Sequence, residues 1–221
     1  MAASERRQVQ QQLKQPDPFF EAIAEAREYF EQNRTKVFGI AAGVGALLVL
    51  VVGGSGYYVS QGRRAASNFA SALSNLEFDS PSAAEADLKG VAGLSNAGPY
   101  TALAALYRGN IASYTGRFDD AAAAYDEFLA GAPTDYLRQI GLMGKAAALE
   151  KGGKAAEAAA ALDLATALEG PYRKAALSDR ARLAEKAGDK AAALSNLQKL
   201  LEIEGSTGDA AETEQRIQAL K

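Results

Sequence analysis

The stretch from Gly109 to Pro133 reads GNIASYTGRFDDAAAAYDEFLAGAP, and it decides the fold. Two runs rich in alanine and larger apolar residues lie on either side of Gly116, and neither alternates as a strand would. Glycine favours a tight turn, and proline ends a helix because it lacks an amide hydrogen and clashes with the preceding turn. The stretch therefore predicts two short helices joined at Gly116, the second of which stops at Pro133.

Side-chain size within this stretch predicts how the two helices pack. Gly109 and Ala121 leave room where the paired helices cross, and Phe118 and Tyr125 fill the space between one hairpin and the next. We interpret these four residues as packing positions rather than ligand contacts, because stacked hairpins depend on burying such neighbours.

Glycine and proline residues recur at regular intervals along the chain. Gly98-Pro99-Tyr100 returns 72 residues later as Gly170-Pro171-Tyr172, which halves to a period near 36. The glycines at 116, 153 and 188 lie 37 and 35 residues apart. A period of this length with a glycine turn between two helices resembles the tetratricopeptide class. The later units are degenerate, with Gly153, Ala158 and Leu162 kept in one and Gly188-Asp189, Ala193 and Leu197 kept in the other.

The fold class that follows is all-α. Residues 63–205 are predicted to form an α-solenoid of about four tetratricopeptide-like hairpins. Residues 206–221 are predicted to form a C-terminal capping helix, with Asp209 as its cap and with Ile217 and Leu220 facing inward.

A second organising feature precedes the repeats. The 26 residues from Val37 to Gly62 carry no charge. About 20 apolar residues cross a hydrocarbon core of roughly 30 Å, so residues 37–59 are predicted to form a transmembrane helix. A cleaved secretory signal fits poorly, because the leader of 36 residues is long and contains six acidic residues. Small residues four apart could admit a neighbouring helix in the membrane, and the candidate packing positions are Gly39, Ala42, Gly43 and Ala46.

The segments before the span differ from each other. Residues 1–16 are polar and rich in glutamine, which predicts a disordered tail. Residues 17–36 are predicted to form a juxtamembrane amphipathic helix with Phe19, Ile23, Ala26 and Phe30 on one face. This face either docks on a partner or on the lipid surface, or the helix is a simple extension of the span.

Basic residues near the span favour one orientation. Arg27, Arg34 and Lys36 precede it, and Arg63 and Arg64 follow it. The rule that cytoplasmic flanks are the more basic then predicts a cytoplasmic N-terminus and a periplasmic C-terminal domain, with a single pass through the bacterial inner membrane.

Composition excludes several classes of site. The 221 residues contain no histidine, cysteine or tryptophan. Triads that use histidine, thiol nucleophiles and ordinary zinc sites are therefore absent. Only chemistry based on carboxylates, lysine or tyrosine is left for an enzyme, and we expect no enzymatic activity, cofactor or metal. The net charge of −3 also argues against a nucleic-acid partner.

A stack of hairpins presents a curved surface lined by the first helix of each pair, and such surfaces bind proteins. The residues predicted to line this groove lie opposite the packing positions, although several could instead fill gaps between helices. They are Leu106, Asn110, Tyr114, Met143, Ser178 and Arg182.

The order of segments resembles one known family. A cytoplasmic tail, an uncleaved span from Phe38 to Tyr58, Asn68-Phe69 and the unit from Gly109 to Pro133 are similar to the ancillary subunit of the bacterial SecYEG translocon. The resemblance implies a membrane-anchored module that binds the translocon or periplasmic chaperones and assists protein translocation. The alternative is a structural accessory subunit of another membrane complex, in respiration or cell-envelope assembly, that packs through Gly39 and Gly43.

Overall fold

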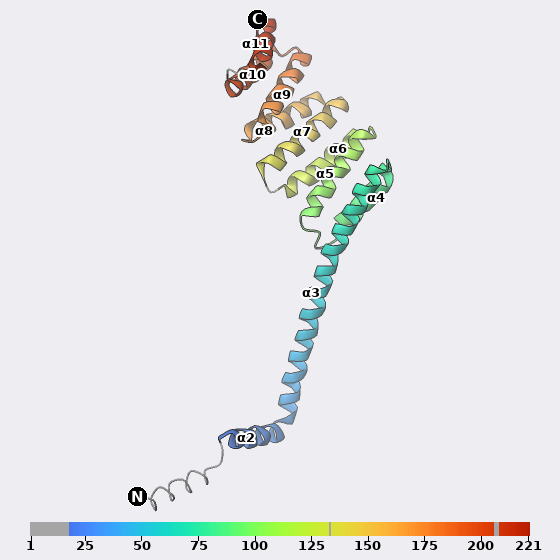
Figure 1. Cartoon of the computed structure of the whole chain (residues 1–221), viewed down its shortest axis with the longest axis vertical. Coiled ribbons are helices and arrows are strands. Elements are labelled where there is room, and N and C mark those ends of the chain that lie inside the picture. Colours follow the sequence, from blue (N-terminus) through green and yellow to red (C-terminus); the bar gives the residue numbers. More distant parts are fainter. Residues whose placement is uncertain (1–17, 133, 206–207) are drawn as a thin grey trace, which may run out of the picture. The chain divides into compact units, whose positions relative to one another are not determined.

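The computed structural model describes residues 18–132, 134–205 and 208–221, and all regular structure in these ranges is helical (Figure 1). The helices are α2 (Pro18–Gln32), α3 (Arg34–Glu77), α4 (Pro81–Ala92), α5 (Pro99–Tyr114), α6 (Phe118–Gly131), α7 (Asp135–Lys151), α8 (Ala155–Ala167), α9 (Arg173–Ala187), α10 (Lys190–Glu204) and α11 (Gly208–Leu220). The chain divides into a first unit that ends at Tyr57 and a second that begins at Tyr58. The predicted tail at residues 1–16 and the helix stop at Pro133 lie outside the described residues.

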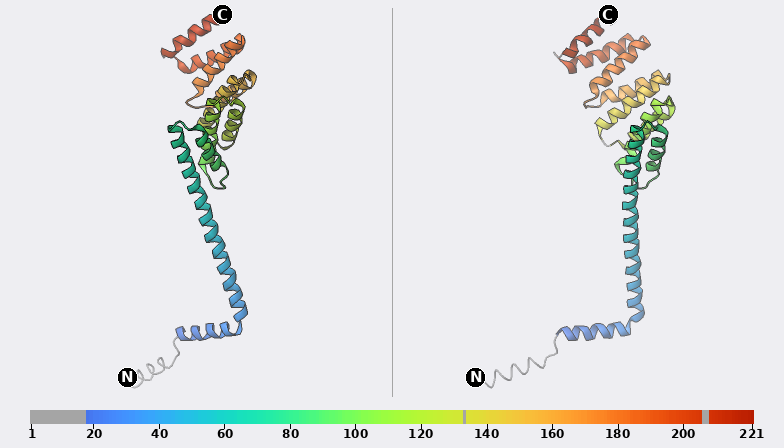
Figure 2. Two further views of the ribbon diagram at one scale, coloured as in Figure 1. Left: turned by 90° about the vertical axis from the view of Figure 1, so that its right-hand side faces the viewer. Right: turned by 45° about the vertical axis from the view of Figure 1, so that its right-hand side comes forward.

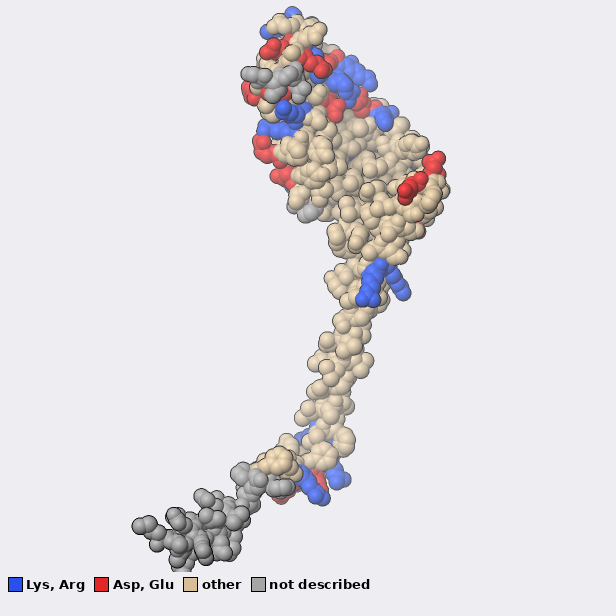
Figure 3. Space-filling model, in the orientation of Figure 1, with Lys and Arg blue, Asp and Glu red and all other residues tan. Residues whose placement is uncertain are grey.

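The first unit contains α2 and the apolar part of α3. The helical path bends at Asn33, whose side-chain amide donates a hydrogen bond of 3.1 Å to the carbonyl of Tyr29. The predicted helix at residues 17–36 is thus divided, because α2 ends at Gln32 and α3 begins at Arg34. α3 contains an 18-residue window that is long and apolar enough to cross a membrane, and none of this window is buried. Figure 3 shows no charged side chain along the thin, tan part of this helix.

The sequence predicted a helix at 37–59 and a repeat domain that begins at residue 63. In the structure, α3 covers the predicted span and continues into the first part of the predicted repeat domain, where it ends at Glu77. Arg63 and Arg64 do not interrupt it, since arginine is a good helix former. In the second unit the end of α3 becomes buried. The ring of Phe69 packs on those of Tyr100 and Tyr107, with centroids 5.5 Å away in each case. Ser71 and Asn75 of α3 also donate hydrogen bonds of 2.6 and 2.9 Å to Asp87 of α4, so the last turns of α3 act as the first helix of a hairpin with α4.

The second unit continues as the hairpins α5/α6, α7/α8 and α9/α10, followed by α11, which packs on α10 (Figure 2). Gly116, Gly153 and Gly188 stand in the three turns with φ of 77°, 79° and 77°. Glycine adopts this left-handed region without a steric penalty, so the turns sit where the glycine spacing predicted them. α11 begins at Gly208, which places Asp209 in its first turn, and Ile217 is buried as predicted.

Tyr125 of α6 is the central side chain of the stack. Its ring is buried between Gly109 of α5 and Gly144 of α7, where a methyl group would come within 2.9 Å and 2.7 Å of ring atoms. Its hydroxyl donates a hydrogen bond of 2.7 Å to Asn110, and burial raises the pKa of this phenol. The role of Gly109 as a space for its neighbour is confirmed. Gly144 has the same role from the next hairpin, and the sequence had not indicated it.

Ion pairs connect residues about one repeat apart. Arg117 binds Glu85, and Arg182 donates hydrogen bonds of 2.8 and 2.9 Å to Glu150; each pair is 32 residues apart. Arg216 of α11 binds Glu185 of α9 at 3.1 to 3.3 Å and is 31 residues beyond it. The first pair ties the α3/α4 hairpin to the α5/α6 hairpin, the second ties α7/α8 to α9/α10, and the last ties α11 to α9.

Candidate protein-binding surface

A hollow of about 320 Å³ lies where the end of α3, the start of α4 and the face of α5 meet. Its lining combines apolar, aromatic and polar side chains, namely Leu76, Asp79, Pro81, Tyr107, Asn110, Ile111 and Tyr114. Pro81 stands at the start of α4, where its missing amide hydrogen costs nothing. Asp79 has a φ of 54°, an uncommon conformation for a residue with a side chain, and it reverses the chain between α3 and α4.

Large aromatic side chains near this hollow are open to solvent. Tyr114 is 81% exposed at the end of α5, and Phe78, which precedes Asp79 in the turn, is 76% exposed. Exposed aromatic residues next to a concave, partly apolar surface are typical of protein interaction sites. We call this region the Tyr114 hollow.

The structure brings two of the six predicted groove residues together. Asn110 and Tyr114 both line the Tyr114 hollow. Leu106 and Met143 are half-buried against core clusters, so they fill space between helices. Ser178 accepts a hydrogen bond from Arg216, and Arg182 is paired with Glu150. These four residues thus have partners within the chain.

The part of the hollow that comes from the preceding hairpin was not predicted from the sequence. Leu76, Asp79 and Pro81 were missed because the helix containing Leu76 was expected to be separate from the span. A signal was present, since Phe78-Asp79-Ser80-Pro81 combines an exposed aromatic with residues that end one helix and begin the next.

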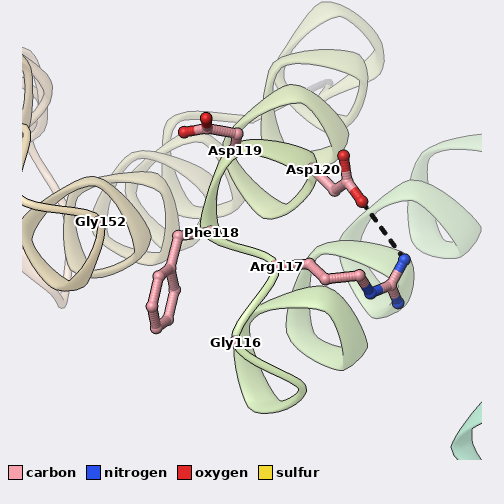
Figure 4. Close-up of a pocket in the computed structure, with 6 residues that line it drawn as sticks. All are labelled: Gly116, Arg117, Phe118, Asp119, Asp120 and Gly152. Carbon is pink, nitrogen blue, oxygen red and sulfur yellow. Dashed lines mark hydrogen bonds and ion pairs between the residues drawn. The ribbon is translucent and has the colours of Figure 1, made fainter.

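A second hollow, of about 380 Å³, lies at the turn between α5 and α6 (Figure 4). Its lining is Gly116, Arg117, Phe118, Asp119, Asp120 and Gly152. Arg117 binds Glu85 and Asp120, and Asp119 accepts a hydrogen bond from Lys154 at 2.9 Å. These ion pairs connect neighbouring elements of the stack. We therefore assign the charged residues of this turn a role in stability rather than in ligand binding. The described residues contain no group of three potential metal ligands.

A fall in pH is expected to weaken the ion pairs between hairpins. Hydrogen bonds from Arg182 and Lys186 hold the pKa of Glu150 at about 2, below its ordinary 4.5, and Arg117 and Lys89 do the same for Glu85. A carboxyl group with a lowered pKa stabilises the fold above its unfolded pKa, and this contribution is lost as the pH falls toward the folded pKa. Because the arginines are partly exposed, each pair contributes about 1–2 kcal/mol. Urea unfolding of the full chain in detergent should show this loss between pH 5 and pH 2.

The substitution Glu150→Gln tests whether the carboxylate of Glu150 stabilises the stack. The variant should be less stable at pH 7 and should lose less stability on acidification than the unmodified chain. Glu169→Gln is the matched control, because Glu169 lies in a loop, 81% exposed, and pairs only with Arg173 in the described part of the chain. An equal acid-dependent loss in the Glu150→Gln and unmodified chains would show that this carboxylate does not stabilise the stack.

Comparisons with known proteins agree with the repeat architecture. No family model matches the chain, and no curated protein matches it in sequence. Among solved structures, a tetratricopeptide repeat protein from Parabacteroides merdae is similar, with a TM-score of 0.61 and 18% identity over 72% of this chain; the match spans 60% of that protein. A kinesin light chain protein with TPR-like repeats from Podosopora anserina has a TM-score of 0.55 and 16% identity, over 71% of this chain and 85% of its own. The chain thus has a tetratricopeptide-like fold.

Proposed function

We propose that the chain is a membrane-anchored protein-interaction module that assists protein translocation, or recruits periplasmic chaperones, at the bacterial inner membrane. The observation that carries this proposal is the Tyr114 hollow, a partly apolar surface with an exposed aromatic on a tetratricopeptide-like stack. The uncharged, exposed window of α3 supplies the anchor.

Anchoring is the mechanism in this proposal. A module tethered to a membrane next to a translocon keeps its bound partner at an effective concentration of about millimolar, so weak contacts at the hollow suffice. The excess of basic residues on the N-terminal flank of the span, with Arg27, Arg34 and Lys36 against Arg63 and Arg64, favours a cytoplasmic N-terminus. In this orientation the repeat domain is periplasmic. Its fold uses no disulfide bond there, because the sequence contains no cysteine.

The alternative is a structural accessory subunit of another membrane complex, in respiration or cell-envelope assembly. The feature that favours it is the strip of Gly39, Ala42, Gly43 and Ala46, which lie three or four residues apart and so share one face of α3. A neighbouring helix could approach this strip closely.

Photocrosslinking in intact cells separates the two proposals. A benzophenone amino acid at position 114 is expected to give a discrete adduct with a translocon subunit or chaperone. The matched control is position 164, because Leu164 is also a large exposed apolar residue but lies on α8, outside the hollow. A third probe at position 43 reports on the strip in α3.

Adducts from position 114 that are absent from position 164 would support the interaction module. Replacement of Tyr114 by Ala should then weaken the complex by about 2 kcal/mol, or roughly 30-fold, as for other aromatic residues at the centre of an interface. Adducts mainly from position 43, with subunits unrelated to secretion, would contradict the module and favour the accessory subunit.

A further inference from the structure

Helix α2 carries an apolar stripe that the proposed function does not use. Phe19, Ile23, Ala26 and Phe30 recur at intervals of four, three and four residues, which places them on one face of a helix. These side chains are exposed, Phe19 by 65%. The opposite face carries Glu25 and Glu28, which are also exposed.

The bend at Asn33 sets the direction of this stripe. Figures 1 and 2 show α2 running crosswise to the adjoining part of α3. The ring of Phe30, at the end of the stripe, makes an edge contact with that of Phe38 in the first turns of α3, with centroids 5.8 Å apart. The stripe thus faces the side on which α3 continues, and the acidic face is turned away from it.

We infer that α2 lies in the headgroup region of the lipid bilayer, with its apolar stripe toward the acyl chains and Glu25 and Glu28 toward water. This inference rests on the proposed function, because α3 must cross the bilayer for a helix crosswise to it to lie in the membrane plane. A helix with one apolar and one charged face is suited to this position.

The continuity with α3 favours lipid over a protein as the surface that covers the stripe. Phe38 stands at the start of the uncharged run, where the hydrocarbon would begin, and the contact with Phe30 places the stripe at the same level. A straight extension of α3 would instead carry Arg27 and Glu28 into or beyond the interface and leave the apolar stripe in water. Because the helical path bends at Asn33, the apolar stripe can instead lie along the interface.

The absence of tryptophan allows a direct test with single-tryptophan variants of the full chain. Phe19→Trp and Ile23→Trp place the probe on the stripe, and Glu28→Trp is the matched control on the opposite face. Val49→Trp places it within the uncharged run of α3. Each variant is reconstituted into phosphatidylcholine vesicles that contain lipid brominated either near the headgroup or deep in the chain, and aqueous iodide is added as the second quencher.

The stripe probes are expected to emit at shorter wavelength than Glu28→Trp and to lose most of their fluorescence to the shallow bromines. Glu28→Trp should be quenched by iodide instead. Two stripe positions are used so that a failure of one variant to fold leaves the other. If both stripe probes are quenched by iodide as strongly as Glu28→Trp, the inference is wrong. If they are shielded from iodide but not quenched by either bromolipid, a protein surface covers the stripe, and the inference is also wrong.

Val49→Trp distinguishes this failure from a failure of the anchor. Strong quenching by the deep bromines supports a membrane span, whatever the stripe probes show. If Val49→Trp is not quenched by lipid, α3 does not cross the bilayer, and the proposed anchoring fails together with the inference. If Val49→Trp is quenched but the stripe probes remain in water, only the inference about α2 fails.

Discussion

Replacement of Tyr125 by Ala is expected to destabilise the repeat domain by about 3–5 kcal/mol, as for other large aromatic side chains in a core. The side chain is 3% exposed and fills the space between α5 and α7, and its loss would leave a cavity lined by Gly109 and Gly144. It would also remove the hydrogen bond to Asn110. Chemical unfolding of the full chain in detergent, followed by circular dichroism, measures this change.

Tyr114→Ala is the matched control, because the same substitution at a side chain 81% exposed should change stability by less than about 0.5 kcal/mol.

A double-mutant cycle tests the contact between Gly144 and the ring of Tyr125. Gly144→Ala alone should destabilise by about 1–3 kcal/mol, because the new methyl group meets a rigid ring. Combined with Tyr125→Ala, the same change should be neutral or stabilising, since alanine favours a helix by about 1 kcal/mol over glycine. Additive effects of the two changes would contradict the packing described here.

Two arginines in the middle of the uncharged run of α3, Leu48→Arg with Val49→Arg, are expected to prevent membrane insertion. Each arginine at the centre of a span costs about 2.5–3.5 kcal/mol, so the pair costs about 5–7 kcal/mol. The large apolar residues between Val37 and Val59 together favour insertion by roughly 3–7 kcal/mol, which the two charges would cancel. Extraction of membranes with alkaline carbonate should then release the variant, whereas the unmodified chain should stay in the pellet.

The control for this experiment is Tyr57→Arg with Tyr58→Arg. These positions lie near the end of the uncharged run, where a long side chain can extend to the interface at little cost. This variant should remain in the membrane pellet. If the Leu48→Arg, Val49→Arg variant is retained as firmly as the control, the apolar part of α3 does not act as a membrane anchor.

The hairpins could be predicted from the sequence because their turns depend on local chemistry. A positive φ at Gly116 or Gly188 is a property of one residue, and its recurrence gives the period directly. The partners of Tyr125 are different. Gly109 comes from the same hairpin, and its role was expected; Gly144 comes from the next one, and its contact depends on where α7 crosses α6. Sequence spacing alone does not fix that crossing.

The candidate site shows the same limit. Asn110 and Tyr114 were predicted to share a surface because helical periodicity places both on one face of α5, and both line the Tyr114 hollow. Leu76 and Asp79 join them because α3 continues beyond the uncharged run and packs against α5, and helical periodicity does not predict this contact between separate helices. Arg182 was expected in the groove, and the structure pairs it with Glu150, which is 32 residues earlier. Opposite charges about one repeat apart carried that information.

The helices of the stack contact helices one or two places along the chain. The interfaces of one hairpin therefore depend on its immediate neighbours, and on α11 at the C-terminal end. The gain or loss of a hairpin between α6 and α11 would leave the contacts among α3, α4 and α5 unchanged. Evolution can thus lengthen or shorten the stack by duplication or deletion of single units, without altering the Tyr114 hollow.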